Sequence, residues 1–198
     1  AQAGYYGGDQ YAHGLATIAM CEAYGLTGDP TIKASAQLGL NYVVASQDPV
    51  GGGWRYTMRS SGDTSVTGWM VMALKSGQMA GLTVPKTALK KAEAFINSCE
   101  SSDKGGYGYL PNGGESAAMT AVGALCRQYM GVSPRNASLL ASIKKMKKSP
   151  PASTQNIYYL YYATQVMHHM GGEAWDYWNA GPDGRNGIRD TLIARQDK

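Results

Sequence analysis

The 198-residue sequence is poor in charge, since Asp, Glu, Lys and Arg make up only 16% of it. A globular domain usually has about a quarter of such residues, and disordered chains and coiled coils have more. Long apolar runs are missing too, and none approaches the roughly 20 residues of a membrane-spanning helix. The first residues do not resemble a signal peptide. The composition therefore favours a folded domain with its own core and no membrane span.

Cysteine is also scarce. Cys21, Cys99 and Cys126 are odd in number and lack the spacing of a metal site. Each falls in an apolar helical context, where a buried free thiol is the usual outcome. A disulfide framework is not expected in a chain of this size. From these residues we predict no metal and no cofactor.

The net charge of +4 is small, and much of it comes from one cluster of lysines. We interpret the cluster as a solvated helix face rather than a phosphate-binding patch. No aromatic residues alternate with the lysines, so nucleic acid is not an expected partner. The phosphate loop, the nucleotide fingerprint and the serine nucleophile elbow are missing. The cluster consists of Lys144, Lys145, Lys147 and Lys148.

What the sequence does contain is tyrosine and a repeated turn. There are 14 Tyr and 4 Trp against 1 Phe, a balance that suits partly wet surfaces better than a sealed core. The turn motif reads Gly-Gly-Trp-Arg-Tyr at residues 52–56 and Gly-Gly-Tyr-Gly-Tyr at residues 105–109, which is 53 residues later. A degenerate copy, Gly-Tyr-Tyr-Gly-Gly, occupies residues 4–8. This spacing is typical of a repeat architecture.

A helical stretch that closes on glycine follows each copy of the motif, and a fourth such stretch lacks the motif. These stretches are apolar on nearly all sides, which predicts inner helices buried on several sides. More polar stretches with one apolar stripe alternate with them and predict outer helices. The inner helices are predicted at Tyr11–Gly25, Thr64–Gly81, Glu115–Gly131 and Thr154–Gly171, and the outer helices at Thr31–Gln47, Pro85–Glu100, Arg135–Lys148 and Gly187–Gln196.

This alternation predicts an all-α fold without a sheet. Stacked helix pairs give a curved array or a closed ring, so we expect an α/α toroid, partial or complete, of about four inner and outer pairs. Residues 1–198 would form a single repeat domain. The sequence opens inside a turn and closes on an outer helix, so we also expect it to be a fragment of a longer repeat protein.

The pattern of Gln47 followed by Gly53 and Trp54 resembles the prenyltransferase/squalene-oxidase repeat, which triterpene cyclases share with the β subunits of protein prenyltransferases. Residues 11–17 and 63–69 resemble segments of planctomycete-type bacterial repeat proteins of uncharacterised function. The resemblance covers nearly the whole chain. It implies a terpenoid cyclase-like fold but no single activity, because one fold hosts many functions.

The resemblance makes Asp63 the best candidate for a catalytic acid. Enzymes similar to squalene–hopene cyclase carry an Asp-x-Asp-Asp-Thr-Ala motif at the start of an inner helix, and the matching place here reads Ser-Gly-Asp-Thr-Ser. One carboxylate of three remains. The alternative role of Asp63 is a helix cap, a position that Asp favours, and the two roles can coexist.

Glu115 is the second candidate acid. Protein prenyltransferases hold a zinc ion with Asp, Cys and His ligands. The region that resembles the Asp and Cys positions contains Glu115 and Ala117, so the thiolate is replaced and we expect no zinc. A place in the first turn of a helix is the alternative role of Glu115.

His13 and three aromatic residues complete the candidates for ligand binding. The segment Ala12-His13-Gly14 resembles one that helps to hold an isoprenoid diphosphate, and His13 also fits a satisfied buried histidine. Aromatic residues on the predicted inner helices would either line a cavity or pack in the core. The candidate ligand-binding residues are therefore His13, Asp63, Trp69, Glu115, Tyr158 and Tyr161.

Three functions remain open at this stage. The first is a binding or scaffold module with degenerate catalytic motifs, whose partner is an apolar small molecule or a protein. The second is a prenyltransferase- or squalene-cyclase-like enzyme that acts on an isoprenoid in a toroid cavity. The third is a carbohydrate-active α/α toroid using Asp63 and Glu115, whose carboxylates would have to lie about 5–9.5 Å apart. We favour the first.

Overall fold

All regular structure in the computed structural model is helical over the residues it describes, 4–196. Isolated β-bridges join turn residues, but no strand forms in this range. The predicted all-α class is confirmed. None of the helices between residues 4 and 196 is long and apolar enough to cross a membrane. The helices are α1 (Gln10–Thr27), α2 (Pro30–Ser46), α3 (Thr64–Met79), α4 (Lys86–Ser98), α5 (Ala117–Tyr129), α6 (Ala137–Lys147), a 3₁₀ helix η1 (Pro151–Ser153), α7 (Ile157–Met170), α8 (Gly172–Ala180) and α9 (Ile188–Ala194).

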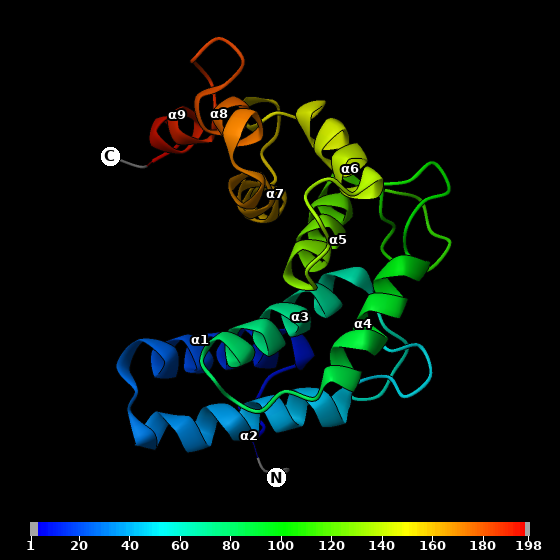
Figure 1. The fold of residues 1–198 in the computed structure, drawn as a ribbon, viewed down its shortest axis with the longest axis vertical. Coiled ribbons are helices and arrows are strands. Elements are labelled where there is room, and N and C mark those ends of the chain that lie inside the picture. The colour runs from blue at the N-terminus through cyan, green and yellow to red at the C-terminus, as the bar shows by residue number, and fades with distance from the viewer. Residues whose placement is uncertain (1–3, 197–198) are drawn as a thin grey trace. The chain divides into compact units, whose positions relative to one another are not determined.

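The chain divides into two compact units that meet between Cys99 and Glu100. The first unit contains α1 to α4, and α1 packs against both α2 and α3 (Figure 1). The second unit contains α5 to α9, and α5 packs against both α6 and α7. In each unit an inner helix therefore contacts its own outer helix and the next inner helix.

The fourth helix pair differs from the sequence prediction. The segment predicted as its outer helix, Gly187–Gln196, contains the shorter α9, which packs against α8 and η1. Besides the inner helix α5, α7 packs against α8, a helix that the sequence did not predict. Gly171 precedes this helix and Gly172 begins it, and both have positive φ. Such a pair is typical of a helix end, but the chain only bends there and continues as a helix. Trp178 fixes α8 by donating its indole N–H to Thr164 of α7 at 2.9 Å.

Burial of the inner helices follows the prediction only in part. Every residue is buried from Thr64 to Leu74 in α3 and from Met119 to Cys126 in α5. The prediction of burial on several sides is wrong for α1 and α7, since each of them buries one face. Apolar residues such as Leu15 in α1 and Ile157 in α7 are exposed.

Two inner helices begin later than the sequence predicts. The α5 helix begins after Ser116 rather than at Glu115, and the α7 helix begins after Asn156 rather than at Thr154. In both cases the polar residue next to the apolar run accepts a hydrogen bond from a free N–H of the first helical turn, as a preferred cap does. A polar residue further upstream is then left outside the helix.

Three copies of the repeated turn place a glycine against an outer helix. Gly4, Gly52 and Gly105 all have positive φ. A Cβ atom on Gly52 would lie 2.4 Å from the Lys91 carbonyl oxygen of α4, and one on Gly105 would lie 2.7 Å from the Ser138 carbonyl oxygen of α6. Only glycine tolerates both this backbone conformation and this close approach. The glycines of the motif thus bring the turn into contact with the outer layer.

Gln47, the first residue of the family-like pattern, forms hydrogen bonds both to the same turn and to α4. Its side-chain amide donates to the Gly52 carbonyl at 2.7 Å and to the Ala88 carbonyl of α4 at 2.9 Å. The side chain is buried, so both bonds are protected from water. In the second unit Glu100 stands 53 residues later and accepts the Gly105 N–H at 2.9 Å. The pattern therefore has a structural role in both units.

Replacing Gly105 by alanine should destabilise the protein more than the same change at Gly131. Both glycines have positive φ, so each variant incurs backbone strain of about 1 kcal/mol or more. Nothing lies within 4 Å of a Cβ on Gly131, whereas a Cβ on Gly105 meets α6. We expect an additional loss of about 1–3 kcal/mol for Gly105→Ala from this overpacking. Urea denaturation of the two variants measures the difference, and equal losses would contradict the packing argument.

Candidate functional site

A recurring hydrogen bond joins each repeated turn to the helix that follows it. The backbone N–H of Trp54 donates to Thr67 Oγ1 at 3.0 Å, and the backbone N–H of Tyr107 donates to Thr120 Oγ1 at 3.2 Å. In both cases the acceptor stands four residues after the helix N-cap. We call this bond, from the N–H of the turn aromatic residue to a side chain at that helical position, the turn latch.

His13 occupies the latch position of α1, four residues after the cap Asp9. The Tyr6 N–H lies 3.4 Å from His13 Nδ1, and the Gly39 carbonyl of α2 lies 3.2 Å from Nε2. Only the tautomer with its proton on Nε2 satisfies both contacts, because Nδ1 must then accept. Both ring nitrogens of this predicted ligand residue therefore lie within hydrogen-bond distance of protein atoms.

The His13 ring is fully buried among aromatic side chains. Its centroid lies 4.5 Å from the ring of Tyr42, 5.3 Å from that of Tyr6 and 5.9 Å from that of Tyr5. Burial lowers the pKa of His13 below its ordinary value, and the hydrogen bond to the Gly39 carbonyl offsets only part of this effect. The neutral imidazole is the form that the surroundings favour.

Asp63 caps α3, as the sequence predicts. Its Oδ1 accepts the Val66 N–H at 2.8 Å, and its own N–H donates to the Trp54 carbonyl at 2.8 Å. The residue is completely buried, whereas the corresponding caps Asp9 and Ser116 are exposed. The second carboxylate oxygen, Oδ2, has no hydrogen-bond partner and lies 3.8 Å from Arg55 Nε. Asp63 therefore serves as a cap through one oxygen, while its other buried oxygen has an ion pair but no hydrogen bond.

Glu115 does not stand in a first helical turn, because it precedes the cap of α5. Its carboxylate binds Lys145 Nζ at 2.9 Å and accepts the Ser101 hydroxyl at 2.9 Å. Lys145 also binds Asp103 at 2.8 Å, and hydrogen bonds to both carboxylates raise the pKa of the lysine. Of the lysine cluster, one member thus has a defined structural role rather than a purely solvated one.

The space over the turn is filled differently in the two units. In the first unit the ring of Phe95 covers Gly53 and Gly62, so closely that a Cβ on Gly53 would lie 2.8 Å from it. In the second unit Glu115 stands 53 residues after Gly62, and its carboxylate covers Gly106. An ion pair with Lys145 therefore takes the place of an apolar ring.

A hollow of about 240 Å³ lies beside this ion pair in the second unit. The start of α5 and the end of α6 form its walls. Two lysines and one carboxylate contribute charge to it, so its chemistry is mixed. Its lining residues are Glu115, Ser116, Ala117, Thr120, Lys145, Met146, Lys148 and Ser149.

The three aromatic candidates lie on inner helices. Trp69 of α3 is almost fully buried and lies against α1, where a Cβ on Gly14 would be 3.3 Å from the Trp69 Cβ. Tyr158 and Tyr161 of α7 contact the ring of Tyr162 at centroid distances of 4.9 and 5.3 Å. Tyr161 is 45% exposed, so its ring is accessible from solvent.

The structure brings only some candidates together. Trp69 of α3 packs on Gly14, the residue next to His13 in α1. Tyr158 and Tyr161 share one aromatic cluster on α7. Asp63 belongs to the first unit and Glu115 to the second, and each has partners within its own unit.

Sequence reasoning missed a partly buried ion pair in the second unit. Arg127 of α5 binds Glu100 at 2.7 Å and also donates to the hydroxyl of Tyr107. Burial raises the pKa of Glu100, but its hydrogen bonds with Ser138 and Gly105 and the charge of Arg127 outweigh this effect and lower it overall. The alignment of Gln47 with Glu100 at the 53-residue spacing was the available signal for it.

The cysteines are free and buried, which confirms the sequence prediction. Burial raises the pKa of Cys21 to about 11 and that of Cys126 to about 12, so both are thiols at neutral pH. Within residues 4–196 there is no group of three or more His, Cys, Asp or Glu side chains that could hold a metal ion.

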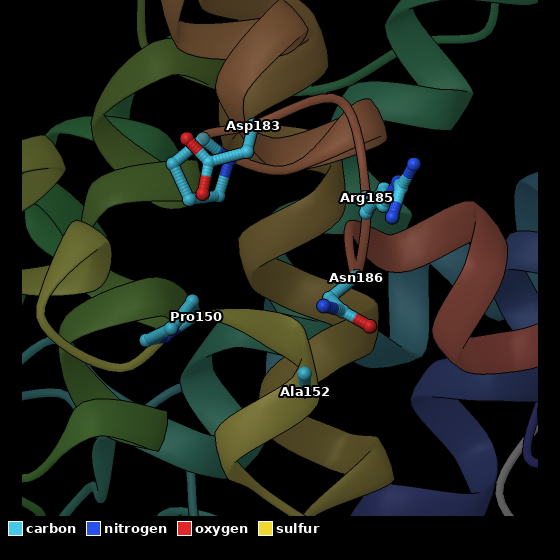
Figure 2. A pocket seen from close by; sticks show the side chains of 6 residues that line it. Pro150, Ala152, Asp183, Arg185 and Asn186 are labelled. Carbon is cyan, nitrogen blue, oxygen red and sulfur yellow. The ribbon is translucent and has the colours of Figure 1, made fainter.

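A second hollow, of about 420 Å³, lies beside the loop between α8 and α9 (Figure 2). Figure 2 shows Pro150 and Ala152 on one side of it and Asp183, Arg185 and Asn186 on the loop. The Arg185 side chain points away from Asp183 in this view. The polar groups thus do not converge on one point, as they do in a typical ligand site.

Comparison of the chain with protein-family models, with curated proteins and with solved structures finds no match.

Replacing Lys145 by alanine should destabilise the second unit in a salt-dependent way. Exposed ion pairs are screened as the Debye length falls from about 10 Å at 0.1 M salt to about 3 Å at 1 M. We expect the shift in the urea midpoint to fall to about half or less between these salt concentrations. Lys144→Ala, on the exposed side of α6, is the matched control and should shift the midpoint less. A loss independent of salt would show that packing, and not the ion pair, matters at Lys145.

Proposed function

We propose that this chain is a binding or scaffold module built from repeated helix pairs, with an apolar small molecule or a protein as its partner. The observation that carries the proposal is the structural use of the residues with catalytic potential. Asp63 caps α3, Glu115 is paired with Lys145, and His13 forms a turn latch. Side chains in such roles are less available for chemistry, while the turns they support are retained.

For the fold we propose a terpenoid cyclase-like α/α toroid, partial or complete. Two observations, one of helix contacts and one of burial, support this arrangement. Inner helices of consecutive pairs pack on each other within each unit, as α1 does on α3 and α5 on α7. The long buried stretches of α3 and α5 suit positions inside such a layer. The resemblance to cyclase and prenyltransferase repeats leads to the same architecture.

A candidate surface for an apolar partner lies on α7. Ile157 and Tyr161 are 58% and 45% exposed on this helix, and Tyr158 directly follows Ile157 in the sequence. Tyrosine offers a flat apolar ring with a polar tip, which suits a partly wet contact. This aromatic face supports the choice of an apolar ligand over a charged one.

One observation favours an enzyme as the second candidate. Asp63 Oδ2 is buried without a hydrogen-bond partner, and Arg55 lies 3.8 Å from it. A protonated carboxyl group at this place could transfer a proton to an isoprenoid alkene, as the cyclase resemblance implies. The ion pair with Arg55 opposes this role, since it is a structural contact and not the arrangement of a proton donor. The carbohydrate-active alternative has no comparable support.

The activity test uses the protein with squalene and, separately, with prenyl diphosphates. The binding proposal predicts no product from either substrate with the wild-type chain or with Asp63→Asn. Product formed by the wild type and lost in Asp63→Asn would overturn the scaffold proposal in favour of the enzyme. Binding is followed in parallel by the thermal shift that each compound causes, with Tyr161→Ala expected to reduce a shift due to contact at α7.

Stability measurements distinguish a structural from a chemical role of Asp63. We expect Asp63→Ala to lower the free energy of unfolding by about 0.5–2 kcal/mol through loss of the cap, whereas Asp63→Asn keeps a side-chain oxygen that can accept the same bond. Asp9→Ala is the matched control, because Asp9 caps α1 with the same geometry at an exposed position. An Asp63→Ala variant at least as stable as the wild type would argue against a cap role and would revive a strained functional carboxyl.

A further inference from the structure

The turn latches differ in one chemical property. The acceptors Thr67 and Thr120 are hydroxyl groups, which keep their acceptor capacity at every ordinary pH. The acceptor in the first turn is the imidazole of His13, which accepts through Nδ1 only while it is neutral. The same hydrogen bond is thus insensitive to pH in two turns and dependent on pH in one.

Protonation of His13 removes the acceptor of the Tyr6 N–H and places two N–H donors against each other. The imidazolium carries a proton on each nitrogen, so Nδ1–H would face the Tyr6 N–H that it previously accepted. The contact between Nε2 and the Gly39 carbonyl would survive. The Tyr6 N–H would then lose its bond unless the turn moved.

The surroundings of the ring offer little compensation for a positive charge. Tyr5 and Tyr6 face it from the turn and Tyr42 from α2, and the Thr17 hydroxyl lies 3.2 Å from Nε2. On the side of α3, Trp69 and Met70 pack against the residue next to His13. Among the described contacts of the ring there is none with a carboxylate. The cap Asp9 lies four residues earlier, and its side chain binds the Ala12 N–H.

We propose that the first turn, residues 4–9, is an acid-released latch, held closed by neutral His13 and opened by its protonation. Release would affect the contacts that the turn makes with α2, namely the Tyr6 hydroxyl bond to the Ser35 carbonyl at 2.6 Å and the approach of Gly4 to Leu38. The aromatic faces of Tyr5 and Tyr42, stacked at 5.0 Å, would become accessible. The inference concerns conformation and is independent of the proposed binding function.

The direction of the pH effect follows from linkage. The pKa of His13 is lower in the closed turn than in an open one, where it returns to about 6.5. The open turn therefore binds more protons, and the closed turn loses stability as the pH falls below about 6.5. Above this pH its stability is complete. One linked proton raises the ratio of open to closed turns by at most about tenfold between pH 7.5 and 5.5.

The wild-type protein contains its own controls for this test. Amide hydrogen exchange of Tyr6, Trp54 and Tyr107 is measured by NMR at pH 7.5 and 5.5 and corrected for the intrinsic exchange rate. We expect the opening of Tyr6 to rise several-fold, up to about tenfold, and that of Trp54 and Tyr107 to change by no more than about twofold. An equal change at all three amides, or none at Tyr6, would overturn the proposal.

A variant and a titration identify the responsible group. His13→Gln keeps an acceptor for Tyr6 and a donor for Gly39 but cannot titrate, so the pH dependence at Tyr6 should disappear. His169→Gln, at the C-terminal end of α7, should leave it unchanged. In the wild type the opening of Tyr6 should begin to rise near pH 6.5 and level off at the pH where the His13 ring signals titrate, and this comparison decides the matter even if His13→Gln fails to fold. A rise that is complete well above the pH of the ring titration would exclude His13.

Discussion

The hydrogen bond between each turn aromatic residue and the following helix is the constraint on which the helix pairs depend. Glycine lies against the outer helix, and the backbone N–H two residues later points toward the inner helix. A buried N–H without a partner is costly, so a side chain of the inner helix must accept it. Thr67, Thr120 and His13 meet this need in three turns. The glycine contact and this bond together thus hold the turn between the outer and the inner helix.

This constraint explains why residues with catalytic potential occur where they do. An inner helix that follows a repeated turn needs a polar cap and, four residues later, a polar acceptor. Asp63 and His13 satisfy such needs at different helices. The same residue types are the ones that an active site requires, so their presence near helix starts is weak support for catalysis. Asp63 is exceptional only because its burial leaves one oxygen without a hydrogen bond.

The sequence predicted the parts of the fold that depend on local pattern. The 53-residue spacing located equivalent turns, and the apolar stretch beginning at Val66 marked a helix that is buried all round. It did not predict α8, because Gly171 and Gly172 resemble the end of a helix. Only the tertiary packing of Trp178 stabilises the helix that follows them. Nor could it predict which inner helices bury one face, since that depends on neighbours. At the site, Asp63 as a cap was predictable, whereas the partner of Glu115 is 30 residues away along the chain.

The two ways of covering the turn show where the repeat can vary without losing its framework. In the first unit the ring of Phe95 covers residue 62. This residue is a glycine because a ring at this distance leaves no room for a side chain there. The second unit has Glu115 at the corresponding place, and Lys145 pairs with its carboxylate at 2.9 Å. The two units thus cover the turn with an apolar ring in one case and with a solvent-accessible ion pair in the other. The latch beneath is the same in both units. Chemical character is therefore set by the covering pair, while the geometry of the turn is set by glycine and the latch.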